Sequence, residues 1–190
     1  RVGKFGDLSC FSFYGNKIIT TGEGGIILTD NESLYEKMKI LKNHGMSPNQ
    51  KYEHPIVGYN FRMTNLQAAI GCAQLEKIET ILAKRREINE QYEFHLKEIV
   101  DTGKIVFQPR AEWAELNHWF FSILLVQPEK RDQLMQALQE KGIDSRPFFS
   151  PIHKQACYTD YAHLEFPVTE LLSKQGINLP THPGLESKNI

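Results

Sequence analysis

The chain has 190 residues, of which 41% are hydrophobic, and its 22 Lys and Arg against 23 Asp and Glu give a formal net charge of −1. This balance offers no electrostatic basis for binding nucleic acid or an anionic membrane surface. The composition is that of a globular protein and excludes the disordered, collagen-like and coiled-coil classes. The longest apolar run, residues 119–126, is far shorter than the ~20 residues of a membrane-spanning helix, so we expect no membrane segment.

Three cysteines, Cys10, Cys72 and Cys157, lie far apart and form no C-x-x-C pair. This spacing argues against a disulfide scaffold or a zinc ribbon and predicts a protein of a reducing compartment, the cytoplasm. We expect all three to be packing residues. The first residues show neither an initiator Met nor the basic-then-apolar layout of a secretion signal, so we expect the chain to begin inside a domain.

The first part of the chain is predicted to contain two strands and a helix. Small and aromatic residues alternate over Leu8–Phe13 as in a buried strand, and Ile26–Leu28 is a second strand candidate. A helix capped by Asp30 or Asn31 should follow, because apolar residues recur there at helical spacing. Asn43–Gly45 has the composition of its C-terminal end.

A loop and a long helix are expected next. Ser47–Phe61 is rich in Pro, Asn, Gly and Tyr without apolar periodicity, which is typical of exposed or site-forming loops. Thr64–Gln67 has the spacing of a capping box, and an apolar stripe at helical spacing follows it. We therefore predict one long helix over residues 64–100, which connects a larger domain, residues 1–63, to a smaller one, residues 101–190.

The last part of the chain is typical of a small α+β layer. A strand is predicted over Phe120–Val126, and a helix over Glu129–Glu140 is stopped by Gly142. From Arg146 onward, five prolines and clustered aromatic residues predict irregular chain wrapped against another part of the protein. The predicted fold class is therefore α/β.

Lys17 is the first candidate for chemistry. A strand delivers it to a turn, with two isoleucines behind it and aromatic residues ahead. Such surroundings can desolvate an ammonium and favour the neutral amine that a nucleophilic lysine needs. Ser12, at the foot of the same turn, could donate a hydrogen bond to a phosphate. The alternative is an ordinary solvated lysine, and the pattern alone favours that interpretation.

The sequence gives little support for a phosphate-binding loop, a metal site or a hydrolase nucleophile. Gly22–Gly25 lacks the spacing of a dinucleotide-binding loop or a P-loop, and we interpret it as a tight backbone crossing. The seven histidines are scattered without a metal-binding spacing, so no metal site is predicted. A G-x-S-x-G elbow is absent, and no cysteine has the surroundings of a nucleophile, which argues against a hydrolase.

Several unrelated motifs occur along the whole chain in a specific order. They are Gly6-Asp7 with Phe11–Phe13, Asn16-Lys17 with Thr21–Gly25, Asn43–Gly45, Gly58–Met63, Gln67–Gly71 with Gln74-Leu75, Arg85-Arg86, Pro151–His153 and Ile177–Pro180. With these motifs the chain resembles the DegT/DnrJ/StrS family, which are pyridoxal-phosphate (PLP) enzymes of aspartate-aminotransferase fold. Members of that family aminate keto-sugars attached to nucleotides.

The resemblance implies roles for individual residues. Lys17 would hold PLP covalently and carry a proton between the amino donor and the cofactor, and Ser12 would hydrogen-bond the PLP phosphate. Asn60 would reach the phosphate of the partner subunit's cofactor, which implies a homodimer with shared active sites. Arg146, Phe148 and His153 would lie near the nucleotide-sugar.

The segments at Tyr14–Thr21 and Arg146–Phe149 are most similar to a subgroup that aminates C4 of GDP-4-keto-6-deoxymannose, the perosamine synthases. Glutamate is the family's usual amino donor. The family's carboxylate for the pyridinium nitrogen and its ring-stacking aromatic residue precede the lysine, which implies that this chain is the C-terminal part of such an enzyme. Two alternatives stay open: a sugar dehydratase of the family, which has His at the position of Lys17, and a sugar-nucleotide-binding relative without catalysis.

Overall fold

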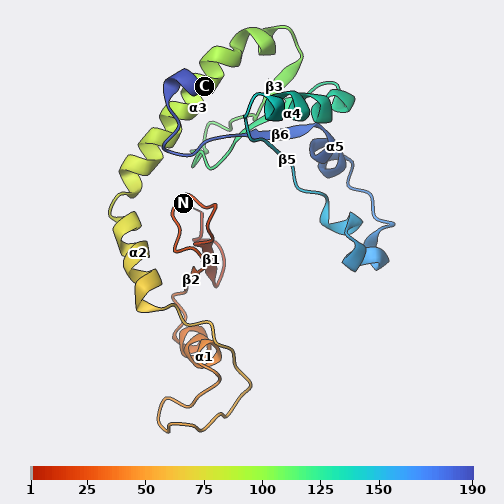
Figure 1. Ribbon diagram of the computed structural model, residues 1–190. Coiled ribbons are helices and arrows are strands. Elements are labelled where there is room, and N and C mark those ends of the chain that lie inside the picture. The colour runs from red at the N-terminus through yellow and green to blue at the C-terminus, as the bar shows by residue number, and fades with distance from the viewer. Residues whose placement is uncertain (1) are drawn as a thin grey trace. The chain divides into compact units, whose positions relative to one another are not determined.

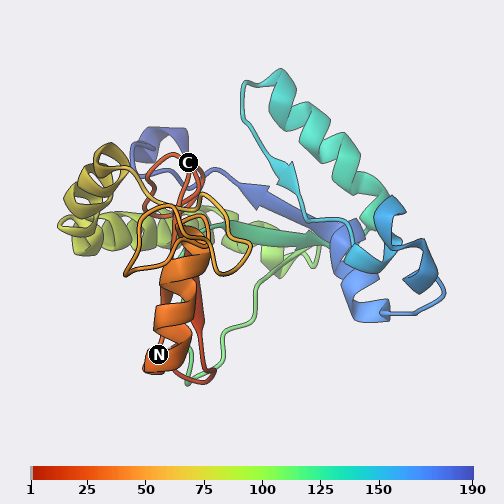
Figure 2. The same cartoon turned by 90° about the horizontal axis from the view of Figure 1, so that it is seen from below.

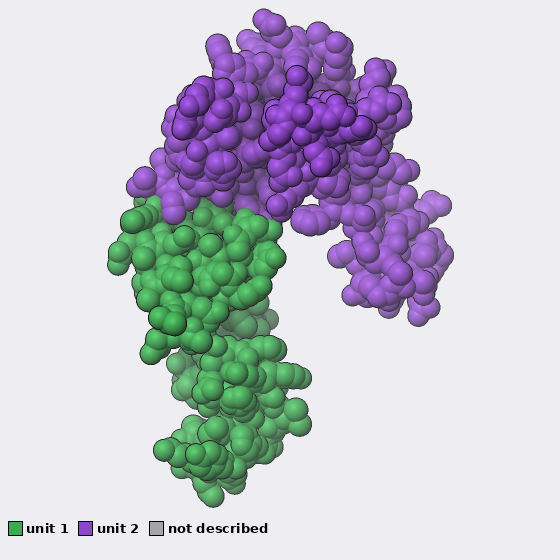
Figure 3. Space-filling model, viewed as in Figure 1, with its two compact units in different colours: residues 1–79 green, residues 80–190 purple. Residues whose placement is uncertain are grey.

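The computed structural model describes residues 2–190 and divides into two compact units, unit 1 (residues 1–79) and unit 2 (residues 80–190) (Figure 3). Unit 1 contains β1 (Ser9–Ser12), β2 (Gly25–Leu28), α1 (Glu32–Lys42) and α2 (Asn65–Leu75). The next helix, α3 (Ile78–Asp101), begins at the end of unit 1 and continues into unit 2. The domain boundary therefore falls inside the segment predicted to be the connecting helix.

The first two predicted strands form an antiparallel ribbon in which Ser9 lies opposite Leu28 and Ser12 opposite Gly25. Their positions agree with the sequence analysis, but their burial does not. Phe11 is 42% exposed, and the apolar residues of β2 are similarly exposed. A two-stranded ribbon has little surface of its own to bury, so the expectation of a buried strand is wrong for unit 1.

Helix α1 begins and ends where the sequence predicts. The Asn31 side chain accepts a hydrogen bond from the Leu34 amide at 3.1 Å, which satisfies one of the free donors at the helix start. At the other end the Gly45 amide donates to the Ile40 carbonyl at 2.9 Å. Gly45 has φ +69°, a left-handed conformation that glycine adopts without steric cost.

The single long helix predicted over residues 64–100 is wrong, because the structure has two helices there. The predicted capping box is present at the start of α2. The Thr64 hydroxyl accepts a hydrogen bond from the Gln67 amide, and the Gln67 side-chain oxygen accepts one from the Thr64 amide. At the end of α2 the Lys77 amide donates to the Gln74 carbonyl at 3.1 Å, which tightens the last turn and interrupts the α-helical ladder. Neither Gly nor Pro marks the break at Glu76-Lys77, so the sequence offered no local signal for it.

Unit 2 is built on a four-stranded antiparallel sheet (Figures 1 and 2). Its strands, in the order β3-β4-β6-β5, are β3 (Ile105–Phe107), β4 (Phe121–Leu125), β6 (Gly176–Leu179) and β5 (Arg146–Pro147). The helices are α3, α4 (Arg131–Glu140) and α5 (Pro167–Gln175), and short 3₁₀ segments lie at Pro128–Lys130, Ile152–Lys154, Ala156–Tyr161 and Ser187–Asn189. The predicted strand at β4 and helix at α4 are both found.

The prediction of irregular chain after Arg146 is wrong in part. Helix α5 begins at Pro167, which is compatible with a first helical position because that residue's amide would have no helical partner. It leads into β6, which pairs with both β4 and β5 inside the sheet. A strand of four residues is too short to show a clear period-2 pattern, so local sequence could not reveal its central place.

The apolar core lies in unit 2, between α3 and the sheet. Ile88 and Ile177 are fully buried, and the rings of Tyr92 and Phe121 stack with their centroids 4.8 Å apart. The remaining core residues are Ile105, Ile123 and Leu125. Alternate residues of β4 are buried, so one face of this strand packs in the core.

The cysteine prediction is also wrong. Cys10, Cys72 and Cys157 are all exposed and free. Cys10 lies on the exposed ribbon and Cys72 on α2, a helix without a buried residue. In the part of the chain that the structure describes, no helix has the length and apolarity to span a membrane.

The core predicts a large difference between two chemically identical substitutions. Ile177→Ala should lower the free energy of unfolding of unit 2 by about 2–5 kcal/mol, because it leaves a cavity in a sealed site. Ile152→Ala should change it by less than about 0.5 kcal/mol, because Ile152 is 72% exposed. Tryptophan fluorescence during urea denaturation reports on this unit, since both tryptophans, Trp113 and Trp119, lie in it. Equal midpoints for the two variants would contradict the assigned core.

Candidate functional site

Lys17 lies on a closed loop that follows β1. The loop is closed at its base, where the Phe13 amide donates to the Gly24 carbonyl at 2.9 Å and the Thr21 amide donates to the Phe13 carbonyl at 3.0 Å. Within the loop the Lys17 amide donates to the Tyr14 carbonyl at 2.9 Å, which forms the predicted turn. The Lys17 side chain is partly buried. The structure thus places Lys17 five residues beyond Ser12, the last residue of the strand.

The loop is fixed to α2 by two glutamines. The Gln74 side chain accepts a hydrogen bond from the Thr20 amide at 2.7 Å, and the Gln67 side chain donates to the Glu23 carbonyl at 3.1 Å. Gly71 lies between them on the same helix, and a Cβ there would come within 3.0 Å of the Thr21 side chain. Sequence reasoning gave Gln67, Gly71 and Gln74 no role in the site, although all three lie within the motifs of the family resemblance.

Gly24 is required by the path of this loop. Its φ is +153°, and a Cβ on it would lie 2.4 Å from the Thr21 hydroxyl oxygen. A side chain at this position would therefore force the buried Thr21 and the base of the loop apart. The interpretation of Gly22–Gly25 as a tight backbone crossing is confirmed at Gly24 and at Gly25, where a Cβ would lie 3.0 Å from the Phe11 carbonyl oxygen, but not at Gly22, where a Cβ would meet no atom within 4 Å.

The donor chemistry of the loop fits PLP. The Ser12 hydroxyl oxygen accepts a hydrogen bond from the Tyr14 amide at 3.2 Å, so its own hydrogen can be donated to a phosphate oxygen. Lys17, on the loop that follows Ser12, supplies the primary amine that an aldehyde cofactor needs for a covalent link. Ser12 and Lys17 are therefore the residues of this unit that could hold the phosphate and the aldehyde carbon of PLP.

Asn60 lies on a second loop, which runs beside the end of α1. Backbone hydrogen bonds join the two segments: the Tyr59 amide donates to the Leu41 carbonyl at 2.7 Å, and the His44 amide donates to the Tyr59 carbonyl at 2.8 Å. Asn43 and Asn60 form an isolated antiparallel bridge at the same place. The motifs Asn43–Gly45 and Gly58–Met63, whose first residues are 15 positions apart in the sequence, are therefore held together by these hydrogen bonds.

Two glycines allow this close approach. A Cβ on Gly45 would lie 1.9 Å from the Ile56 carbonyl oxygen, and a Cβ on Gly58 would lie 1.9 Å from the Gly45 amide nitrogen. Asn60 itself is exposed, and its side-chain oxygen accepts a long hydrogen bond of 3.4 Å from the Arg62 guanidinium. The loop thus presents the Asn60 amide at the surface of unit 1.

Arg146 and Phe148 lie beside β6 in unit 2. Arg146 is opposite Asn178 in the β5–β6 pairing, and its exposed side chain lies 3.9 Å from the Asp144 carboxylate. Phe148 packs its ring directly over Gly176, where a Cβ would come within 2.2 Å of the ring. Phe148 therefore has a packing role in the sheet, whereas the Arg146 guanidinium is available at the surface.

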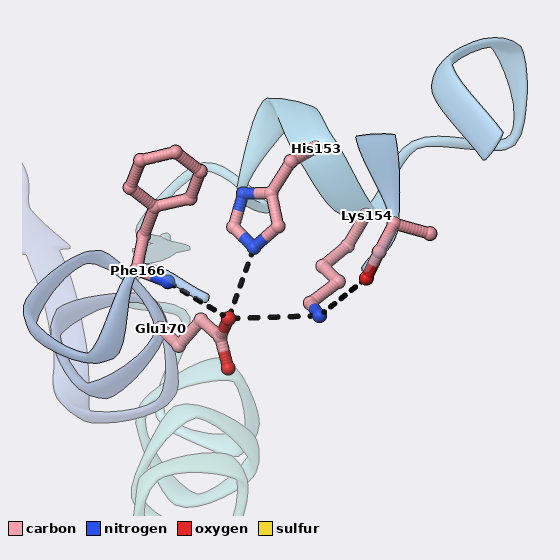
Figure 4. Close-up of polar contacts among 5 residues, drawn as sticks. His153, Lys154, Phe166 and Glu170 are labelled. Atoms are coloured by element: carbon pink, nitrogen blue, oxygen red, sulfur yellow. Dashed lines mark hydrogen bonds and ion pairs between the residues drawn. The ribbon is translucent and has the colours of Figure 1, made fainter. Parts of the chain in front are cut away.

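His153 belongs to a polar cluster (Figure 4). Its side chain is 8% exposed, and its Nε2 lies 2.9 Å from Oε1 of Glu170 on α5. The same Glu170 oxygen contacts the Lys154 ammonium at 3.6 Å and the Phe166 amide at 3.5 Å. The hydrogen bond from His153, assisted by the Phe166 amide and by Lys154, holds the pKa of Glu170 below its ordinary value. Sequence reasoning found His153 but missed Glu170.

Arg85, on α3, is a buried cation. Its guanidinium donates to the Trp119 carbonyl at 2.9 Å and to the Thr181 hydroxyl at 3.2 Å, and burial lowers its pKa. It thus ties the helix to the segments before β4 and after β6. This contact joins residues 96 positions apart, so the Arg85-Arg86 motif alone could not predict it.

Unit 2 also has a cavity of about 680 Å³ beside α3, β3, β4 and α4, lined mainly by apolar residues such as Leu96, Leu125 and Leu134. None of the predicted site residues lines it. In unit 1 the predicted residues lie on two loops, one that follows Ser12 and carries Lys17 and one that carries Asn60. In unit 2 they lie along the segment from Arg146 to His153.

A family model described as the DegT/DnrJ/EryC1/StrS aminotransferase family matches residues 1–190, the whole chain. The chain belongs to this family. GDP-perosamine synthase of Caulobacter vibrioides is 42% identical over 193 residues, which cover 100% of the chain and 51% of that protein. The chain thus spans about half the length of the curated relatives that it matches.

Solved structures of DegT/DnrJ/EryC1/StrS relatives have the same fold. PseC of Helicobacter pylori, an aminotransferase in pseudaminic acid biosynthesis by its description, superimposes with a TM-score of 0.90 at 28% identity, covering 100% of this chain and 52% of PseC. NtdA of Bacillus subtilis, solved with the cofactor PMP, gives a TM-score of 0.86 at 30% identity, covering 99% of this chain and 45% of NtdA. The predicted α/β fold class, part of a PLP aminotransferase fold, is confirmed.

The Glu170 cluster predicts a sensitivity to acid. Because the pKa of Glu170 lies below its ordinary value of 4.5 in the folded chain, the ionised carboxylate stabilises the fold above pH 4.5. This contribution is lost as the pH falls through the lowered value of the folded state. The urea midpoint of the wild type should therefore fall more steeply below pH 4.5 than that of Glu170→Gln. Glu186→Gln, at another ion-paired but exposed glutamate, should follow the wild type; identical slopes for all three would contradict the prediction.

Proposed function

We propose that the protein containing this chain transfers an amino group to the keto carbon of a nucleotide-linked 4-keto-6-deoxy sugar, with PLP as cofactor. The observation that carries the proposal is the closed loop that begins directly after Ser12 and carries Lys17, and that α2 holds through two glutamine side chains. This loop occurs in a chain that matches an aminotransferase family over its whole length.

Lys17 and Ser12 have distinct roles in this reaction. When bound, PLP supplies the electron sink that makes removal of a proton from the donor amino acid feasible. The Lys17 amine anchors the cofactor and afterwards acts as the general base and acid that moves this proton. Ser12 donates a hydrogen bond to the phosphate and so fixes the position of the cofactor relative to Lys17.

The proposed substrate is GDP-4-keto-6-deoxymannose, which would be converted to GDP-perosamine with glutamate as amino donor. Support comes from the identity of 39–42% with three proteins named GDP-perosamine synthase. The exposed guanidinium of Arg146 suits the diphosphate of a sugar nucleotide, since arginine recognises phosphate by paired hydrogen bonds. Phe148 and His153, a few residues farther along, are proposed to border the sugar.

The alternatives fit the chain less well. A sugar dehydratase of the same family would have a histidine where this chain has Lys17, and without that lysine the proton transfer of ordinary transamination lacks its base. A relative that binds sugar nucleotides without catalysis has no need for the Ser12, Lys17 and Asn60 set. We therefore favour the aminotransferase.

The active site is proposed to be shared by two subunits of a homodimer. The Asn60 amide is exposed on a loop whose backbone is fixed by hydrogen bonds and by the Gly45–Gly58 approach. Such a loop can present a side chain to a neighbouring subunit without a large ordering cost. In a two-fold dimer the exchange is reciprocal, so that each site contains one subunit's Lys17 and its partner's Asn60.

Lys17 is the residue on which the proposed reaction depends. Borohydride reduction of the full-length holoenzyme, followed by peptide mapping, should find the pyridoxyl group on Lys17. Lys17→Ala should lower the amination rate by about 10²–10⁴-fold or more, because it removes the general base. Lys4→Ala, at an exposed lysine of the same unit, should keep the wild-type rate. A pyridoxyl group on another lysine would refute the assignment.

The substrate is tested with a panel of keto-sugar nucleotides in the presence of glutamate. A preference for a GDP-linked 4-keto-6-deoxy sugar is expected. A clear preference for a UDP-linked or dTDP-linked ketone would contradict the sugar assignment and leave the aminotransferase proposal standing. No amination of any member of the panel by the PLP-loaded enzyme would contradict both.

The shared site predicts complementation between two inactive variants. Lys17→Ala and Asn60→Ala subunits, mixed under conditions of subunit exchange, should form heterodimers with one intact site and one doubly defective site. Activity should then rise to at most about half of the wild-type value per heterodimer. If both residues served the same subunit's site, every site would keep one lesion. Verified exchange without recovery would therefore rule out the shared site.

A further inference from the structure

His153 is held in a defined orientation by its surroundings. The ring is buried, its Nε2 lies 2.9 Å from Glu170 Oε1, and it packs in a T-shaped arrangement with the Phe166 ring, with centroids 4.8 Å apart at 61° (Figure 4). Glu170 comes from the first turn of α5, whereas His153 lies in the 3₁₀ segment Ile152–Lys154. The two side chains thus join separate elements of unit 2.

The contact also determines where the imidazole carries its proton. The Glu170 carboxylate accepts from the Phe166 amide and lies beside the Lys154 ammonium, and both interactions favour its ionised form. An ionised carboxylate has no hydrogen to donate, so His153 must donate from Nε2. In the neutral imidazole, Nδ1 is then the acceptor.

The other ring nitrogen is left for a ligand. His153 Nδ1 makes no hydrogen bond to a residue that the structure describes, and it is not sealed from solvent. By contrast, the three side-chain atoms that are both sealed and without a partner among the described residues are Arg85 Nε, Gln91 Oε1 and His118 Nδ1. A buried ring with one nitrogen paired and the other accessible is suited to accept a hydrogen bond in a fixed direction.

We propose that Glu170 is a positioning residue that keeps His153 in the Nε2-protonated tautomer, so that Nδ1 accepts a hydrogen bond from a hydroxyl group of the sugar. The involvement of the sugar rests on the proposed function. Lys154 completes the arrangement, because its ammonium also donates to the Ala162 carbonyl at 3.2 Å and so limits the movement of the Glu170 carboxylate. His153, Lys154 and Glu170 are the ionisable groups of this cluster.

The tautomer can be measured directly. Nitrogen NMR of the full-length holoenzyme with labelled histidine, assigned with His153→Asn, should show Nε2 protonated and Nδ1 unprotonated in the neutral imidazole. Glu170→Gln keeps the size of the side chain, but its amide can either donate or accept, so a mixture of tautomers is expected. A protonated Nδ1 in the wild type, or an unchanged tautomer in Glu170→Gln, would overturn the inference.

Kinetics then test the connection to the sugar. Glu170→Gln should raise KM for the keto-sugar nucleotide about tenfold, as expected when one oriented hydrogen bond is lost. The first half-reaction, in which the amino donor alone reacts with the holoenzyme, should keep its rate within about twofold, because His153 faces the sugar. Equal losses in both half-reactions would indicate a structural role and contradict the proposal.

A double-mutant cycle separates positioning from folding. His153→Asn keeps a hydrogen-bond acceptor near the position of Nδ1 but has no group that reaches Glu170. In this background Glu170→Gln should change KM for the sugar by less than about twofold, because Glu170 acts through His153. Glu186→Gln is the matched control and should leave the tautomer and both half-reactions unchanged. An additive tenfold effect in the His153→Asn background would contradict the proposal.

The experiments distinguish a failure of the proposed function from a failure of the proposed positioning of His153 by Glu170. If the wild type shows the Nε2-protonated tautomer but aminates no keto-sugar nucleotide, the proposed function fails while the positioning of His153 by Glu170 stands. If it aminates the sugar but Glu170→Gln alters neither tautomer nor KM, the positioning proposal fails alone.

Discussion

The sealed packing of α3 against β4 and β6 is the constraint on which unit 2 depends. Ile88 on the helix and Ile177 on β6 have no exposed surface, and β6 pairs with β4 on one side and β5 on the other. The position of β6 therefore fixes Arg146 through strand pairing and Phe148 through Gly176. It also fixes the end of α5, the helix that carries Glu170. A loss of packing at Ile177 would consequently move every candidate substrate residue of this unit.

Unit 1 holds its residues by other means. No apolar side chain among its described residues is buried, and the loops of Lys17 and Asn60 are fixed by hydrogen bonds and by close glycine contacts. A two-stranded ribbon with exposed apolar residues is marginal in water by itself. The loop geometry around Lys17 therefore depends on α2, through Gln67 and Gln74, more than on a core. Hydrogen bonds fix directions well, which suits residues whose chemistry needs an exact orientation.

Sequence analysis succeeded where the signal was local. The caps at Asn31 and Thr64 and the strand at β4 were predicted because their causes lie within a few residues of one another. It failed where the cause was distant. The central place of β6 is decided by pairing with residues 30 to 58 positions away, and the burial of β1 depends on what covers it. Only the resemblance to the family made Lys17 a candidate cofactor residue, because the pattern alone favoured a solvated lysine.

The pairing of His153 with Glu170 shows why site chemistry is harder to predict than site residues. A histidine in a Pro-Ile-His motif can be an acceptor, a donor or a cation, and the sequence does not distinguish these forms. The choice is made by a carboxylate 17 residues away, whose own ionisation depends on the Phe166 amide and Lys154. The core brings these elements together by placing α5 next to β6. The hydrogen-bonding form of His153 is thus a property of the folded unit rather than of its motif, and substitution of Glu170 can change it while leaving His153 itself in place.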